Sequence, residues 1–192
     1  MSSQQIENKI RGFVGIRFNL HKALLPLHAE LEILTRDKST KLRVVPPDNL
    51  HITLKFLGNV EQDRLASLES MLLSLSQECS PLQIDCRGVG FFKNSIWVGI
   101  EENPALALLS NAIDEACGPL GFAKESKKYV PHVTVARFGK EARIKLSDLQ
   151  RKFAQQDWGK FTAEKIALYK SETLPTGAIY SVLTNFDLSA IN

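Results

Sequence analysis

Cysteine is scarce in this sequence and long hydrophobic runs are missing, and each absence excludes a class of protein. The three cysteines, Cys79, Cys86 and Cys117, are an odd number without a Cys-x-x-Cys spacing. This usage argues against a disulfide framework or a cysteine zinc site, and it fits buried thiols in a reducing compartment. No apolar stretch approaches the length of a membrane span, and residues 1–9 lack the apolar core of a signal peptide. We therefore expect a cytosolic protein without a membrane partner.

A strong charge of either sign is absent as well. The formal net charge of +3 permits an anionic ligand, but it does not by itself indicate nucleic-acid binding, which usually requires a strongly basic patch. The hydrophobic fraction of 44% is ordinary for a globular protein that buries a core, and 192 residues suit one domain. Composition therefore leaves the function to be read from motifs.

Two short stretches of the chain read almost alike. They are His51-Ile52-Thr53-Leu54 and His132-Val133-Thr134-Val135. Side chains alternate across a strand, so in each stretch the imidazole and the hydroxyl share one face and the aliphatic residues take the other. Two such strands could place two imidazoles on either side of one small ligand.

The elements expected around these stretches repeat in one order. The first half has an apolar strand at 13–16, a helix at 20–34, a histidine strand at 51–57, a helix at 61–77 and a strand at 82–86. The second half has a strand at 96–100, a helix at 104–117, a histidine strand at 132–138, a helix at 147–155 and strands at 161–170 and 178–186.

This order predicts a duplication, with halves at about 11–92 and 95–186 of a single domain that spans 1–192. Mixed strands and helices of this kind favour the α+β class. We expect a bilobal fold of two antiparallel sheets with flanking helices and a central cleft that carries the two His-x-Thr motifs.

The paired motifs suit acid–base chemistry at phosphorus. Histidine titrates nearest to neutral pH, so one imidazole can accept a proton while the other donates one. A threonine hydroxyl on the same face can donate a hydrogen bond to a phosphoryl oxygen. A nearby cation would offset the charge on the phosphoryl oxygens.

Two other readings of the histidines compete with this one. A single His-x-Thr is common by chance, and a lone strand histidine is usually a surface or packing residue; the matched copies are what favour a paired site. A metal site is the second alternative, but no third ligand stands at a zinc-like spacing and no His-Glu-x-x-His occurs. We expect no metal, and we take His21 and His28 as structural or solvated.

The motifs with their flanks resemble the two signature motifs of the two-histidine (2H) phosphoesterases, and most closely the LigT-like RNA 2′,3′-cyclic phosphodiesterases. The resemblance rests on His51-Ile-Thr-Leu-Lys-Phe-Leu-Gly58 and Pro131-His-Val-Thr-Val-Ala-Arg137. Three further stretches extend it over nearly the whole chain: Arg11-Gly-Phe-Val-Gly-Ile16, Gly90-Phe-Phe-Lys93, and Leu168-Tyr-Lys-Ser171 with Gly177 and Tyr180.

The resemblance implies an enzyme that hydrolyses a terminal 2′,3′-cyclic phosphate on RNA to a 2′-phosphate, without a metal or another cofactor. It implies that His51 is the proton donor and His132 the proton acceptor, although the repeat makes the two nearly equivalent and leaves their order open. Thr53 and Thr134 match the threonines that contact the phosphate, and Arg137 matches an arginine used at the phosphate.

Strand parity raises a question about Arg137. It shares parity with Val133 and Val135, so it would point away from His132 unless the strand ends or bulges near Ala136. The alternative is a solvated arginine at a strand end.

Aromatic residues near the motifs could stack a terminal base: Phe56, Phe92, Tyr129 and Trp97. Alternation puts Phe56 on the core face, where we expect it to pack, so Phe92 beside a glycine turn is the better candidate.

Basic residues surround the second motif and could steer an RNA backbone: Lys124, Lys127, Lys128, Arg137, Lys140, Arg143 and Lys145.

Two functions compete with the main one. The first is a 2H enzyme for another cyclic phosphate, such as ADP-ribose 1″,2″-cyclic phosphate or a cyclic nucleotide. The second is a non-catalytic RNA or nucleotide binder, which has no need of two proton-transfer groups. We expect a monomer without an obligate protein partner.

Overall fold

The computed structural model describes residues 9–139, 146–174 and 177–190, and it has the α+β class that the sequence predicts. The strands are β1 (Lys9–Arg17), β2 (Arg43–Val44), β3 (His51–Glu61), β4 (Leu82–Phe92), β5 (Ser95–Ile100), β6 (His132–Arg137), β7 (Asp157–Ala163), β8 (Lys165–Leu174) and β9 (Gly177–Asp187). The helices are α1 (Leu25–Thr35), α2 (Leu65–Gln77), α3 (Pro104–Cys117) and α4 (Leu146–Phe153), with short 3₁₀ turns at His21–Leu24, Lys38–Thr40, Pro47–Asn49 and Gln62–Arg64.

The expectation of two separate sheets is wrong for the described part of the chain, where nine strands form one curled antiparallel sheet. The order along it is β7-β4-β5-β6-β3-β1-β8-β9, and β2 pairs with β6. The two histidine strands, β3 and β6, lie next to each other in the middle and pair only at Ile52 and Val133. That single pair joins what would otherwise be two sheets, because the strands diverge on both sides of it.

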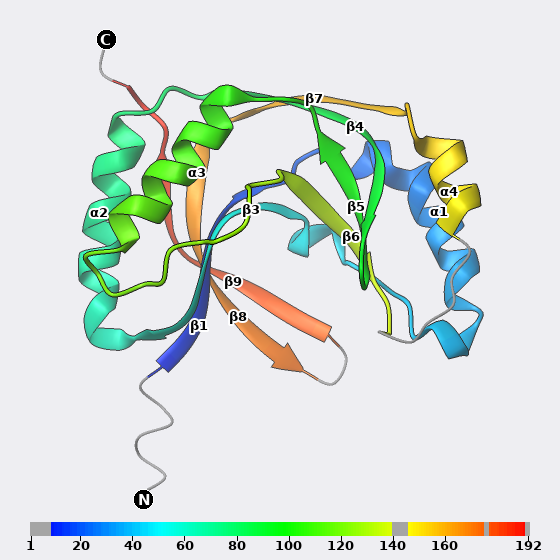
Figure 1. The fold of residues 1–192 in the computed structure, drawn as a ribbon, viewed down its shortest axis with the longest axis horizontal. Helices are drawn as coiled ribbons and strands as arrows, with labels where there is room; N and C mark the ends of the chain where they lie inside the picture. Colours follow the sequence, from blue (N-terminus) through cyan, green and yellow to red (C-terminus); the bar gives the residue numbers. More distant parts are fainter. Residues whose placement is uncertain (1–8, 140–145, 175–176, 191–192) are drawn as a thin grey trace, which may run out of the picture.

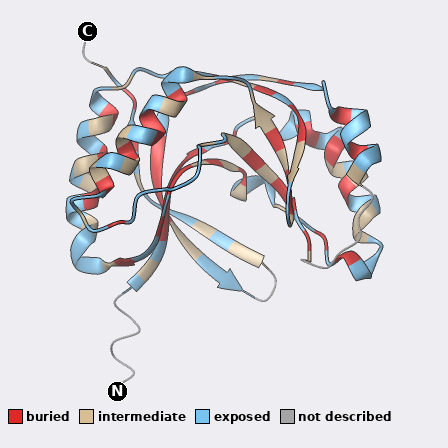
Figure 2. Ribbon diagram, in the orientation of Figure 1, coloured by how far each residue is buried: buried red, intermediate tan, exposed pale blue. Residues whose placement is uncertain are grey.

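The two sequence halves interleave in space. Strand β4 of the first half pairs with β5 and β7 of the second, while β8 and β9 of the second half extend the sheet beyond β1. The helices stand at the two ends of the molecule, α2 and α3 at one and α1 and α4 at the other (Figure 1). Their inward faces are buried, whereas residues 172–174 at the end of β8 are exposed (Figure 2).

Helix α3 shows how the sequence positions these layers. Asn103 caps it by accepting a hydrogen bond from the Leu106 amide, and Pro104 occupies the first turn, where no amide hydrogen is needed. Its apolar residues recur at helical spacing and are buried, with Leu106 and Ile113 fully enclosed. The predicted helix at 104–117 is thus confirmed.

Each histidine strand contains a β-bulge at the fourth motif residue. In β3 the register passes from Thr53 opposite Gly15 to Lys55 opposite Val14, so Leu54 has no partner on β1. In β6 it passes from Thr134 opposite Trp97 to Ala136 opposite Ile96, so Val135 has no partner on β5. The extra residue reverses the alternation of the residues that directly follow it, and in β3 a second register shift comes at Leu57.

The bulges are held by hydrogen bonds to the unpaired residues. The Ser110 hydroxyl donates to the Leu54 carbonyl at 2.8 Å, and the Val45 amide donates to the Val135 carbonyl at 2.8 Å. A buried carbonyl without a partner would be costly, so these bonds stabilise the irregular backbone.

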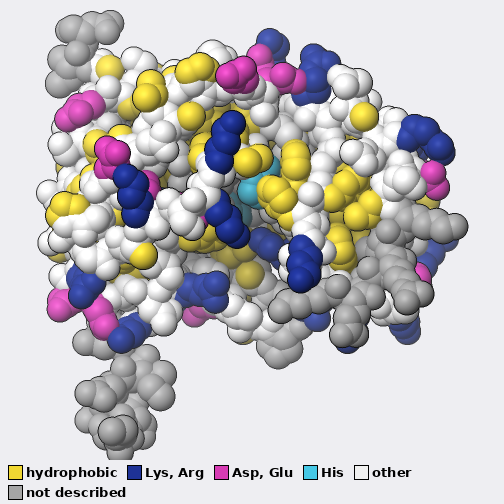
Figure 3. Space-filling model, viewed as in Figure 1, with side chains coloured by type: hydrophobic (Ala, Val, Ile, Leu, Met, Phe, Trp, Pro, Cys, Tyr) yellow, Lys and Arg dark blue, Asp and Glu magenta, His cyan; other side chains and the backbone are white. Residues whose placement is uncertain are grey.

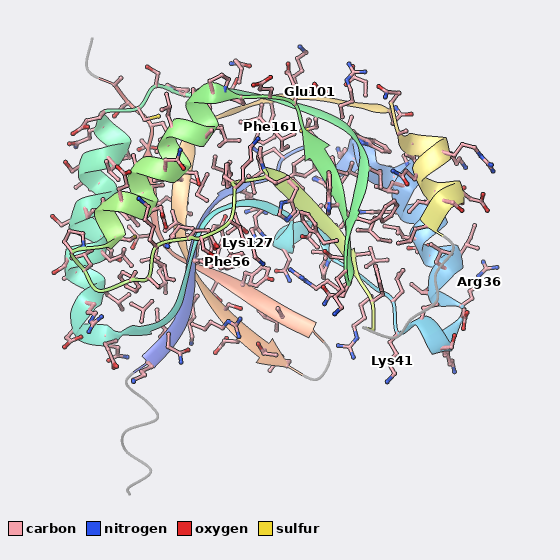
Figure 4. The ribbon with its side chains drawn as sticks, viewed as in Figure 1. Arg36, Lys41, Phe56, Glu101, Lys127 and Phe161 are labelled. Atoms are coloured by element: carbon pink, nitrogen blue, oxygen red, sulfur yellow. The ribbon has the colours of Figure 1, made fainter. Side chains whose placement is uncertain are left out.

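Two side-chain directions follow from the bulges. Phe56 does not pack in the core as simple alternation predicts: it is 63% exposed, whereas Lys55 is buried and pairs with Asp114 on α3. Figure 4 labels Phe56 near the centre of the view, close to the β8–β9 hairpin. Arg137 turns to the face of its histidine through the bulge that the parity argument required. The fifth residue after each histidine therefore emerges on the histidine face.

Candidate active site

The two motif histidines lie on adjacent strands and on the same face of the sheet. Because Ile52 pairs with Val133 in antiparallel register, His51 stands opposite Thr134 and Thr53 opposite His132. The alternate residues, Ile52 and Val133, are fully buried on the other face. Both threonines are half-buried beside the histidines.

Each imidazole is oriented by the same contact. Nδ1 of His51 lies 2.7 Å from the Asn49 carbonyl oxygen, and Nδ1 of His132 lies 2.7 Å from the Val130 carbonyl oxygen. A carbonyl oxygen can only accept, so Nδ1 carries the hydrogen in both rings. In the neutral imidazoles Nε2 then holds the lone pair that can take a proton.

The His51 ring is enclosed by aromatic side chains. Phe13 lies 4.6 Å from it between ring centroids, and Tyr180 meets it edge-on at 5.0 Å. Tyr169 stacks on Phe13 at 4.7 Å and completes the wall. This wall keeps water away from most of the imidazole.

The His132 ring has a more open setting. Phe92 meets it edge-on at 4.9 Å and is itself 41% exposed, while Trp97 lies at 5.9 Å. Trp97 can lie flat on β4 only because residue 90 is glycine: a Cβ there would come within 2.2 Å of the indole. The indole Nε1 of Trp97 is buried and has no hydrogen-bond partner among the described residues.

Burial makes both histidines weaker bases than usual. It lowers the pKa of His51 from 6.5 to about 4, although the hydrogen bond to Asn49 opposes the shift, and the positive charge of Arg137 and the neighbouring His132 add to it. Burial also lowers the pKa of His132, against the bond to Val130 and helped by Arg137. Arg137 therefore lowers the pKa of both imidazoles.

A cavity of about 360 Å³ opens beside His51. Its lining residues come from β1, β3, β6 and the β8–β9 hairpin: Arg11, Gly12, Phe13, His51, Phe56, Gly58, Arg137, Ser171, Thr173, Ala178 and Tyr180. Figure 3 shows a histidine at the bottom of a depression, with Lys and Arg side chains near it on one side and hydrophobic side chains on the other. A smaller cavity of about 180 Å³, near Arg17 and Glu164, holds neither motif histidine.

The structure brings together most of the predicted site residues. His51 and Arg137 line one cavity, and Thr53, Thr134 and His132 adjoin them on the same face. Phe92 contacts His132 but does not line this cavity. The Tyr129 side chain is held against β3 by a hydrogen bond, because its hydroxyl donates to the Thr53 carbonyl at 3.1 Å.

Several lining residues escaped the reasoning from individual motifs. Arg11, Ser171, Thr173 and Tyr180 lie far apart in the sequence and meet only because β1 pairs with β8, and β8 with β9. The available signal was the alternation within 168–174 and 177–182, which would have grouped the hydroxyl and ring side chains on one face of each strand.

No group of three or more His, Cys, Asp or Glu side chains within 9–139, 146–174 and 177–190 is arranged to hold a metal ion. No helix in that part of the chain is long and apolar enough to cross a membrane.

Of the basic residues around the second motif, Lys124 pairs with Glu115 at 3.7 Å, and Lys127 and Lys128 are exposed. Lys140, Arg143 and Lys145 lie outside the described residues.

Comparison with known proteins supplies independent findings. A family model described as the 2'-5' RNA ligase superfamily matches residues 24–174. The RNA 2',3'-cyclic phosphodiesterase of Methanocaldococcus jannaschii is 38% identical over 152 residues, which cover 76% of this chain and 84% of the relative. The protein of the same name from Methanothermobacter thermautotrophicus is 30% identical over 186 residues, covering 94% of this chain and 100% of the relative.

Solved structures agree in fold. Thermus thermophilus TT0787 superposes with a TM-score of 0.79 at 22% identity, covering 95% of this chain and 100% of that one. Escherichia coli LigT, crystallised with NADP+, superposes with a TM-score of 0.74 at 21% identity, covering 95% and 99%.

Proposed function

We infer the reaction of this chain from its membership: it belongs to the 2'-5' RNA ligase superfamily of LigT-like 2H phosphoesterases, whose model matches most of its length. Curated relatives named RNA 2′,3′-cyclic phosphodiesterase align with most of the chain at 30–38% identity. The chain is accordingly an RNA 2′,3′-cyclic phosphodiesterase, a hydrolase. The observation that carries this conclusion to the site is the pair of imidazoles on adjacent strands, each with Nδ1 fixed and Nε2 free.

The proposed reaction is an in-line displacement at phosphorus. Nε2 of His132 takes a proton from water as the water oxygen forms its bond to phosphorus. The bond between phosphorus and the 3′ oxygen breaks, and His51, which enters the step protonated, gives its proton to that oxygen. The product is a 2′-phosphate with a free 3′ hydroxyl, and exchange with solvent returns both imidazoles to their starting states.

The surrounding groups support this reaction. A bound phosphodiester anion favours the charged form of a nearby imidazole, which opposes the burial that lowers the pKa of His51. Arg137, beside both histidines, would stabilise the charge on the phosphoryl oxygens. The hydroxyls of Thr53 and Thr134 would donate to the same oxygens.

We also propose that the fold is one duplicated domain with two lobes that meet at the β3–β6 pair. Corresponding residues support this. Phe13 and Trp97 hold the same place in Phe13-Val-Gly-Ile and Trp97-Val-Gly-Ile, and each packs against the histidine of its own half. The bulges at Leu54 and Val135 correspond as well.

The partner is an RNA end, and we propose that its terminal base rests on Phe92. This ring is exposed and lies edge-on to His132, so a base over it would stay near the reacting phosphate. Stacking on aromatic rings is the usual way in which proteins hold unpaired bases.

The function is tested by incubating the protein with a short RNA that ends in a 2′,3′-cyclic phosphate, in the presence of a chelator. We expect a 2′-phosphate as the only product, identified by its resistance to a 3′-specific phosphatase and by mass. ADP-ribose 1″,2″-cyclic phosphate and a 3′,5′-cyclic nucleotide serve as parallel substrates. Faster turnover of either one than of the RNA would contradict the assignment, as would a reaction that requires added metal.

A further inference from the structure

The cavity beside His51 continues past the reacting centre along three strands. On β1, Gly12 pairs with Lys170 of β8, so Arg11 stands next to Ser171. Ser171 in turn pairs with Tyr180 of β9, and Thr173 pairs with Ala178. Arg11, Ser171 and Thr173 all line the cavity that His51 and Arg137 line. One arginine and two hydroxyls thus meet on a single wall.

The chemistry of this wall suits an anion. No carboxylate is present among the residues that line the cavity. Arg11 is exposed, and within the described part of the chain no ion pair or side-chain hydrogen bond involves it. A guanidinium with hydroxyl donors beside it matches the oxygens of a phosphate.

Arg17 provides the contrast on the same strand. It lies on the same face of β1 as Arg11, but its guanidinium donates to Asp48 at 2.9 Å. Arg17 is therefore paired within the protein, although it lines the smaller cavity, whereas Arg11 has no such partner among the described residues and lines the cavity beside His51.

The order of residues along β1 indicates where a second anion fits. On β1 the residue opposite His51 is Arg17, and Arg11 lies on the same face beyond Phe13, whose ring contacts the His51 ring. With the cyclic phosphate at His51, a second anion of the same substrate can reach Arg11 along the cavity that both residues line.

We propose that Arg11, together with the hydroxyls of Ser171 and Thr173, binds the phosphodiester on the 5′ side of the terminal nucleotide. This inference rests on the proposed function and adds a substrate class to it. The enzyme selects RNA ends over free nucleoside 2′,3′-cyclic phosphates, because only a chain end carries the second phosphate.

The test compares two substrates that differ in one group: adenosine 2′,3′-cyclic phosphate, and the same compound with a phosphate on its 5′ oxygen. For the wild-type protein we expect kcat/KM to be roughly tenfold higher with the 5′-phosphorylated compound, on the scale of a charge-assisted hydrogen bond. Arg11→Gln should bring the ratio of the two kcat/KM values close to one. Arg17→Gln, the matched control, should keep the wild-type ratio. Thr173→Val should lower the ratio by a smaller factor.

The outcomes separate this subsite from the function itself. A wild-type ratio near one overturns the subsite while the hydrolysis stands. An Arg11→Gln variant that loses the same factor on both substrates also overturns it, since Arg11 would then act at the reacting phosphate or on the fold. Failure of the wild-type protein to hydrolyse both compounds and also an RNA that ends in a 2′,3′-cyclic phosphate overturns the proposed function instead.

Discussion

The two histidine strands have the same backbone geometry around the histidine, but they differ in the side chains that this geometry places beside it. In both, a carbonyl two residues before the histidine fixes Nδ1, and a bulge turns the fifth residue after the histidine to the same face. In β3 that residue is Phe56, and in β6 it is Arg137. In the proposed duplication, the backbone geometry is shared by the two halves, while single side chains differ and give the halves different chemistry.

The same contrast extends to the settings of the two imidazoles. Three aromatic rings surround His51, and burial lowers its pKa to about 4. His132 lies beside the exposed ring of Phe92. The resemblance makes His51 the proton donor, yet in the empty site His51 is the histidine that holds a proton less readily. The negative charge of a bound substrate would have to raise the pKa of His51 before it could donate a proton. The roles of the two histidines can be tested by experiment.

The largest expected effect comes from replacing either histidine. His51→Gln and His132→Gln should each lower kcat by about 10²- to 10⁴-fold on an RNA 2′,3′-cyclic phosphate, the usual contribution of a general acid or base. The measurement is single-turnover hydrolysis with both variants checked for folding by circular dichroism.

A substrate with sulfur in place of the 3′ oxygen separates the two roles, because a thiolate leaves without being protonated. It should restore much of the rate of His51→Gln and little of the rate of His132→Gln. Rescue of His132→Gln alone would reverse the assignment. If the sulfur substrate restores the rate of neither variant, neither histidine donates the proton to the leaving group.

The next effect concerns the buried ion pair that only the first strand has. Lys55 follows the bulge of β3 and is 5% exposed against Asp114, whereas Ala136 occupies the corresponding place in β6. Asp114→Asn would leave a buried ammonium unpaired, and we expect it to lower the free energy of unfolding by about 3–5 kcal/mol.

Urea unfolding measures this loss. The control is Asp85→Asn, which removes the exposed partner of Lys160 and should cost no more than about 1 kcal/mol. Equal effects of the two substitutions would show that the pair on β3 is no more important than a surface contact.

The sequence predicts most of the repeated strands and helices, because each depends on local periodicity. The single strand expected at 161–170 is wrong, because this range holds the end of β7 and the start of β8. It also selects the motif histidines as candidates, since similar His-x-Thr patterns at matched places are rare by chance, and the structure puts both on one face of adjacent strands. The directions of Phe56 and Lys55 could not be predicted, because the bulged residue reverses the side chains that directly follow it and no local signal marks Leu54 as the bulge. The single sheet escaped prediction for a similar reason: it depends on one pair, Ile52 with Val133, between distant segments.

The pH dependence of stability should reflect the unequal burial of the histidines. In the unfolded chain His51 takes up its proton near pH 6.5, and in the folded protein near pH 4. Between these values the unfolded state binds more protons, so stability is complete above pH 6.5 and falls by up to about 3 kcal/mol as the pH approaches 4.

The check is the free energy of unfolding of wild type, His51→Gln and His132→Gln between pH 4 and 8. Removing His51 should flatten the curve more than removing His132, because three rings cover His51. Parallel curves for wild type and His51→Gln would contradict the burial argument.

The smallest expected effect tests whether the open setting of His132 receives the terminal base. Phe92→Leu keeps an apolar side chain beside His132 but removes the ring, so an edge or stacking contact worth about 1 kcal/mol is lost. We expect kcat/KM for adenosine 2′,3′-cyclic phosphate to fall roughly fivefold, mostly through KM, by the same conversion of energy to rate. Ribose 2′,3′-cyclic phosphate, which lacks the base, is the matched substrate, and its kcat/KM should change little. If both substrates lose the same factor, Phe92 serves only to pack His132, and the base of the RNA lies elsewhere in the cleft.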